Sequence, residues 1–223
     1  MSSLEADRRY AQFVDFASRF QHPEDLIERL EPLRARIPTA ELLTSPKHKV
    51  LKEAWHAGVF GLGMRVAFEE ASAKEAVYVR LAEPEPYPDF QLRLLDQTYD
   101  FEVTSTTDRA TGELHRRSTR IGPPRPSWIV DEEVPPLDSA ALAGIIRKKL
   151  EKHYAPPAPN LLVYVVEGKG MTMEAVRAAV NEGGGVNFAS VWVLTTTHLG
   201  VARPFAGFPD RPGGWWRIPN DAK

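Results

Sequence analysis

The sequence predicts an α/β domain with a mixed central sheet flanked by helices, preceded by a helical hairpin. Three observations lead to this prediction. Helical periodicity dominates residues 4–73, alternating strands follow within 77–104, and two almost wholly apolar strands separated by a helix occupy 161–194. Apolar strands of this kind are typical of the buried centre of a sheet. We divide the chain into a helical hairpin at 1–44 and an α/β domain at 45–223.

The predicted helices begin with the amphipathic pair that forms the hairpin. Apolar residues recur at helical spacing over 4–20, and a second helix begins after His22-Pro23, with an apolar stripe that runs to Ile37. Ser45-Pro46 then marks the start of a long helix that runs to about residue 73. No predicted strand precedes the glycines inside this helix, so we interpret them as sites of close packing rather than as a dinucleotide-binding loop; they are Gly58, Gly61 and Gly63.

Alternation and turn residues predict the strands. A short strand covers 77–81, and two further strands, at 90–94 and 99–104, alternate apolar and polar residues on either side of Asp96-Gln97. This arrangement is typical of a β-hairpin. A long polar loop at 106–136 follows, and the remaining predicted elements are a helix at 137–154, a strand at 161–166, a helix at 171–181 and a strand at 190–194.

Composition restricts the classes of function. The formal net charge of −2 gives no general attraction to nucleic acid, so a polyanion would need a local basic patch. No apolar run reaches the length of a membrane span, and the N-terminus lacks the pattern of a secretion signal, so we expect a cytoplasmic protein with no membrane contact. The chain has no cysteine, so oxygen or imidazole ligands would have to hold any metal.

The candidate chemistry lies in the predicted hairpin. Asp89 stands at the start of one strand and Glu102 inside the next, so a tight hairpin would bring the two carboxylates together. Neighbouring carboxylates repel each other unless a cation neutralises them, and Mg²⁺, with Mn²⁺ as a substitute, suits such oxygen ligands. A bound ion of this kind can activate water and neutralise charge on a phosphate. The pair therefore predicts phosphodiester hydrolysis.

The same residues carry a family resemblance. Pro88-Asp89 followed by Glu102-Val103-Thr104 resembles the signature of the PD-(D/E)xK nucleases, and the order of elements over about 45–194 resembles their restriction-endonuclease-like core. The resemblance implies that the two acids bind metal and that a lysine, replaced here by Thr104, positions or activates the attacking water. Either the activity is lost, or another lysine has taken over this role.

The helix predicted at 137–154 offers two such lysines. Lys149 shares the inward apolar stripe of this helix, whereas Lys148 stands about 100° away around the helix axis. We therefore expect Lys149 first and Lys148 second as the catalytic lysine. The resemblance also implies a glutamate on the first core helix, and we assign this third metal ligand to Glu69, with Glu53 and Glu70 as competitors.

A basic patch occurs in the polar loop that follows Thr104. Its arginines would contact phosphates on either side of the cleaved bond, and the expected nucleic-acid-binding residues are Arg109, Arg116, Arg117 and Arg120. The expected partner is nucleic acid, with DNA favoured over RNA and a homodimer left open.

Three readings of the sequence remain open. In the first, the protein is an Mg²⁺-dependent nuclease. In the second, the same fold has lost catalysis and binds nucleic acid or a protein partner. In the third, the hairpin at 1–44 recruits a partner to a toxin, immunity or phage-associated protein.

Overall fold

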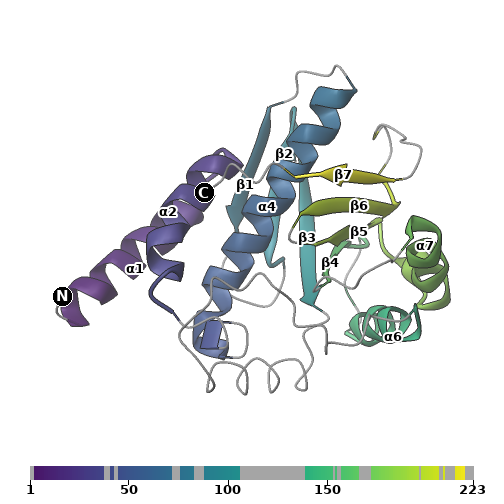
Figure 1. Ribbon diagram of the computed structural model, residues 1–223, viewed down its shortest axis with the longest axis horizontal. Coiled ribbons are helices and arrows are strands. Elements are labelled where there is room, and N and C mark those ends of the chain that lie inside the picture. Colours follow the sequence, from purple (N-terminus) through teal and green to yellow (C-terminus); the bar gives the residue numbers. More distant parts are fainter. Residues whose placement is uncertain are drawn as a thin grey trace.

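A seven-stranded mixed sheet forms the centre of the computed structural model, with helices on both of its faces (Figure 1). The predicted α/β class, with a mixed sheet flanked by helices, is therefore confirmed. The structure describes residues 3–37, 41–42, 45–71, 76–82, 88–105, 139–152, 154, 157–165, 172–195, 197–205, 208 and 214–218.

The strands lie side by side in the order in which they occur along the chain. The pairs β3–β4 and β4–β5 are parallel, and every other neighbouring pair is antiparallel. The strands are β1 (Val77–Leu81), β2 (Phe90–Leu94), β3 (Gln97–Ser105), β4 (Asn160–Tyr164), β5 (Ser190–Leu194), β6 (His198–Arg203) and β7 (Trp215–Arg217).

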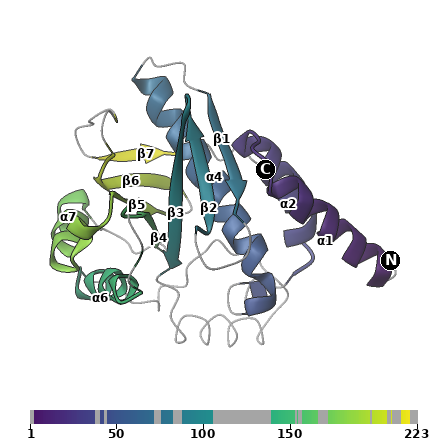
Figure 2. The same ribbon diagram turned by 180° about the vertical axis from the view of Figure 1, so that it is seen from behind.

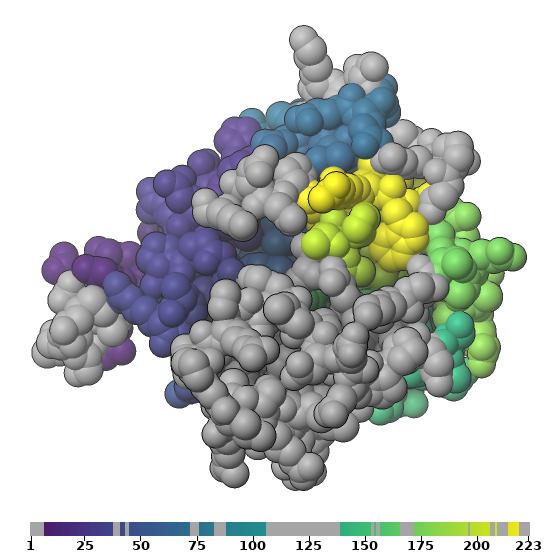
Figure 3. Space-filling view, in the orientation of Figure 1, coloured from purple at the N-terminus to yellow at the C-terminus, as the bar shows by residue number. Residues whose placement is uncertain are grey.

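One face of the sheet is covered by the N-terminal helices. These are α1 (Ser3–Ala17), α2 (Pro23–Arg34), the 3-10 turn η1 (Pro46–His48) and the long helix α4 (Lys49–Glu70). The hairpin packs into the same apolar cluster as α4 and β1, because Phe13 and Leu26 are buried together with Phe60 and Val79. In the space-filling view these purple and blue helices lie at one side of the molecule, and the green helix α7 (Met173–Glu182) lies at the other (Figure 3).

Close packing explains the glycines of α4. A methyl group added at Gly61 would lie 2.6 Å from Cγ of Pro23, and one added at Gly58 would lie 2.6 Å from Cδ1 of Ile27. Both contacts are with residues of α2. This helix packs closely against α4 at the two glycines because glycine has no side chain. The interpretation of these glycines as packing sites is confirmed.

The opposite face carries α6 (Ser139–Leu150) and α7, which pack over the parallel strands together with the 3-10 turn η2 (Gly185–Asn187). The two apolar strands, β4 and β5, are buried along their whole length. In β4, for example, Leu161 faces the α6–α7 cluster and Leu162 faces the α4 cluster. This is the arrangement that the apolar runs predicted.

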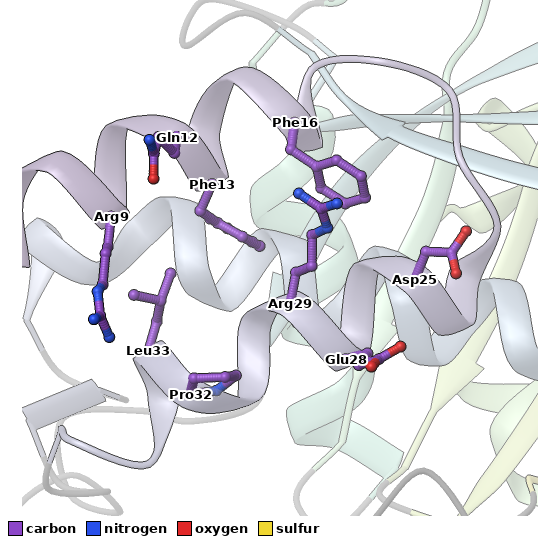
Figure 4. Close-up of a pocket in the computed structure, with 9 residues that line it drawn as sticks. All are labelled: Arg9, Gln12, Phe13, Phe16, Asp25, Glu28, Arg29, Pro32 and Leu33. Atoms are coloured by element: carbon purple, nitrogen blue, oxygen red, sulfur yellow. The ribbon is translucent and has the colours of Figure 1, made fainter.

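A groove of about 620 Å³ lies between the first two helices (Figure 4). Its lining mixes charges of both signs with apolar side chains, and the guanidinium of Arg29 lies 4.0 Å from the centre of the Phe16 ring. Asp89 and Glu102 are not among its lining residues, so this groove is separate from the candidate site described next. Among the described helices, none combines the length and the apolar character that crossing a membrane would require.

Candidate active site

The β2–β3 hairpin brings Asp89 and Glu102 to the same end of the sheet. Phe90 pairs with Phe101, so the next residues outward on the two strands are Asp89 and Glu102. The backbone amide of Asp89 donates to the carbonyl of Phe101 at 2.9 Å, and Oδ2 of Asp89 accepts a hydrogen bond from the amide of Val103 at 2.7 Å. These bonds hold the Asp89 carboxylate against β3 beside Glu102.

Glu102 is a buried carboxylate held by two lysines. Only 2% of the residue is exposed, and its Oε1 accepts hydrogen bonds from Nζ of Lys149 at 2.5 Å and from Nζ of Lys152 at 2.8 Å. Burial by itself raises the pKa of Glu102, but the two lysines more than offset it, so the pKa lies below the ordinary value. Glu102 is therefore ionised at neutral pH and bears a full charge inside the protein.

Burial lowers the pKa of Lys149, whereas it raises that of Glu102. Its side chain is only 15% exposed, and desolvation lowers the pKa of its ammonium group, an effect that Glu102 and Asp89 partly offset. Lys152 is more exposed, and its hydrogen bond to Glu102 raises its pKa instead. Of the two ammonium groups, that of Lys149 is thus the one more easily converted to a neutral amine.

A third carboxylate approaches the site from α4. Burial and the negative charge of Asp89 raise the pKa of Glu53 to about 7, and a hydrogen bond between these two side chains acts in the same direction. Lys49 counters this shift, with its Nζ at 3.4 Å from Glu53 and 3.9 Å from Asp89. Glu53 is therefore partly protonated near neutral pH and in that form can donate to the Asp89 carboxylate.

The structure separates the two candidate lysines. Lys149 reaches Glu102, whereas Lys148 is exposed on the outer side of α6. Thr104 lies two positions beyond Glu102 on the same face of β3, where it pairs with Val163 of β4. Of these two lysines, Lys149 is the one that contacts Glu102, and the catalytic role expected of it stays a prediction.

Glu69 does not join this cluster. From position 53 to position 69 the helix rises by about 24 Å, and Glu69 is exposed at the far end of α4, with its Oε1 3.4 Å from Nε of Arg65. The residues of the predicted basic patch, Arg109, Arg116, Arg117 and Arg120, lie outside the described residues.

The order and direction of the elements indicate that Glu53, rather than Glu69, lies near Asp89. The chain leaves α4 at its C-terminal end and enters β1, so α4 runs antiparallel to β1 and its first turns lie near the end of that strand. Asp89 follows that end of β1, at the start of β2. Lys152 was also missed, although it stands three residues after Lys149 and such residues share one face of a helix.

The donor set of the cluster fits a hard cation. Glu53, Asp89 and Glu102 supply only carboxylate oxygens, the ligands that a hard cation prefers, and the raised pKa of Glu53 indicates negative potential beside Asp89. Within the part of the chain that the structure describes, however, no three acidic or histidine side chains stand in an arrangement ready to hold an ion. In the structure the lysine ammonium groups provide the positive charge.

Comparison with known proteins adds no identification: no family model, no curated protein and no solved structure matches this chain. The site has to be interpreted from its own chemistry.

Proposed function

We propose that the protein is a nuclease of the PD-(D/E)xK type, with a restriction-endonuclease-like core, that hydrolyses phosphodiester bonds of DNA in the presence of Mg²⁺ or Mn²⁺. The observation that carries this proposal is the approach of Lys149, from α6, to the buried Glu102 opposite Asp89. A lysine thus stands beside the acidic pair although the signature position holds Thr104.

The carboxylates would bind the metal. Asp89 and Glu102 lie at the same end of the β2–β3 hairpin, and Glu53 adds a third carboxylate from the opposite layer. An Mg²⁺ ion in this site would neutralise charge on the phosphate and lower the pKa of a bound water.

Lys149 would orient the attacking water and take up its proton. Burial lowers the pKa of this amine, which brings the group closer to the range in which a general base works. Lys152, whose pKa is raised, stays charged and maintains positive potential at the site. Two lysines therefore allow one to exchange a proton while the other stabilises the negative charge of the phosphate.

One observation favours a second candidate function. Both lysines donate to the same oxygen of Glu102, so the carboxylate is already neutralised without a metal. In this alternative the ion pairs are structural, catalysis is lost, and the domain binds nucleic acid or a protein partner.

Cleavage of labelled DNA with Mn²⁺ separates the two candidates. For a nuclease, Asp89→Asn and Lys149→Met should each lower the rate at least about a hundredfold, because general acid–base and metal catalysis contribute effects of this size. Asp96→Asn removes the same charge from the exposed turn and should leave the rate unchanged. DNA binding in chelator without any cleavage in Mn²⁺ would support a nucleic-acid-binding module. The absence of both binding and cleavage of DNA would contradict the nuclease and the nucleic-acid-binding module and would favour a protein partner.

A further inference from the structure

The sheet has an open face beside the candidate active site. α4 covers one face of β1 and β2, and no described helix crosses these strands on the other face (Figure 2). Register places four side chains on this open face, because Tyr78 pairs with Arg93 and Arg80 pairs with Gln91, while their neighbours along the strands are buried beneath. Glu102 has the same parity as Asp100, the partner of Gln91, and so belongs to this face.

Aromatic rings hold the two arginines in place. Gln21 pairs with Val79 at the edge of β1, which sets Phe20 beside the open face. The guanidinium carbons of Arg80 and Arg93 each lie 4.5 Å from the centre of the Phe20 ring, and that of Arg93 lies 4.6 Å from the Tyr78 ring. Stacking on aromatic rings fixes the planar donor groups and lowers the entropy lost when they bind a ligand.

The charge of this arginine pair is not neutralised by the described residues. Nε of Arg80 donates to the neutral amide oxygen of Gln91 at 2.6 Å, and the amide nitrogen of Gln91 in turn donates to Asp100 at 2.6 Å. Asp100 thus satisfies the amide of Gln91. Neither arginine forms an ion pair with an acidic side chain of the described segments.

We propose that Arg80 and Arg93 bind two backbone phosphates of the nucleic acid whose reacting bond lies at Asp89 and Glu102. This proposal rests on the function proposed above, which determines the direction in which the nucleic-acid strand would run from the two arginines to the active site. From the strand spacings, the Cα atoms of the arginines lie about 12–14 Å from that of Glu102, a separation of several nucleotides. Guanidinium groups suit phosphate oxygens because their planar forks form paired hydrogen bonds.

Equilibrium binding of a fluorescent duplex DNA oligonucleotide to the full chain, in chelator and over a series of salt concentrations, tests this surface. Arg80→Gln/Arg93→Gln should weaken binding at least about tenfold at low salt and reduce the slope of log K against log[salt] by about 1.8, the value for two lost phosphate contacts. Because metal is absent, a failure of cleavage does not affect the result.

A matched control removes two positive charges from the other end of the molecule. Arg177 on α7 and Arg217 on β7 are both exposed, and Arg177→Gln/Arg217→Gln should leave affinity within about twofold and the slope unchanged. Arg93→Lys keeps the charge but not the stacked fork, so this variant should lie between wild type and the double variant, and it covers the case in which the double variant fails to fold.

Two results would overturn the proposal. In one, the double variant binds DNA as wild type does, or loses no more affinity than the control. In the other, polyglutamate displaces the labelled DNA as effectively as unlabelled DNA of equal charge does. This result would assign the surface to an acidic protein partner.

Discussion

At the scale of the residue, the chemistry of the site depends on the buried carboxylate of Glu102. Glu102 is ionised although it is almost inaccessible to solvent, and the ammonium groups of Lys149 and Lys152 compensate its charge. The hairpin pattern predicted that Asp89 and Glu102 lie close together, and helical spacing predicted that Lys149 points inward. The pKa shifts could not be predicted, since they depend on distances between separate elements.

Removal of Lys149 should destabilise the fold. We expect Lys149→Met to lower the free energy of unfolding by about 1–3 kcal/mol near neutral pH, because Glu102 then keeps only one ammonium partner. The folded-state pKa of Glu102 is depressed, so this loss should be present above the unfolded pKa and fade as acid protonates Glu102. Urea unfolding measures both effects. Lys148→Met, on the exposed side of α6, is the control and should change stability by less than about 0.5 kcal/mol.

Glu53 should make stability depend on pH with the opposite sign. Its folded pKa of about 7 lies above the unfolded value, so its contribution is complete below the unfolded pKa and is lost as pH rises through the folded one. Glu53→Gln mimics the protonated form. This variant should match wild type near pH 5 and exceed its stability by about 1–3 kcal/mol near pH 8 in urea unfolding. A difference in stability between variant and wild type that is the same at both pH values would contradict the raised pKa of Glu53.

At the scale of the element, two helices use glycine for different reasons. In α4, Gly61 lets the backbone of the helix approach Pro23 and Val79, whereas Gly144 in α6 has no atom within 4 Å of an added methyl group. The sequence predicted the close packing in α4 because no strand precedes the glycines. It gave no reason for Gly144, and nothing in the structure explains it.

The two glycines should therefore respond differently to alanine. Gly144→Ala should raise the free energy of unfolding by about 0.5–1 kcal/mol, since alanine restricts the unfolded chain and is the better helix former. Gly61→Ala should lower it by about 1–3 kcal/mol, because the methyl group meets Pro23 and Val79. Thermal unfolding of both variants in one buffer is the measurement, and a shift of the same sign in both would refute the packing argument.

For the whole molecule, the predictable part of the fold is the part with strong periodicity. The hairpin strands, the apolar strands and the long helix were located from alternation and spacing, and β5 has the predicted bounds. β6 and β7 were not predicted as strands. β6 is interrupted by His198 and Gly200, and β7 has only three residues, so neither shows a continuous apolar or alternating run.

The third carboxylate shows why a site is harder to predict than a fold. Glu53 and Glu69 both stand on α4, about 160° apart around its axis, and the antiparallel course of α4 and β1 brings only Glu53 to the end of the helix near Asp89. A choice made from the apolar stripe alone selected Glu69, which lies at the wrong end of the helix for a contact with Asp89. The predicted roles of the arginines at 109, 116, 117 and 120 remain predictions, since these residues lie outside the described segments.

In the proposed active site, Asp89 and Glu102 hold one divalent cation with the amine of Lys149 beside it. Anomalous diffraction from crystals soaked in Mn²⁺ would locate such an ion. We expect a peak between the two carboxylates, with oxygen distances of about 2.0–2.3 Å and the Lys149 amine directed at the site. Intact ion pairs between Glu102 and both lysines at saturating Mn²⁺, with no peak between the carboxylates, would contradict it.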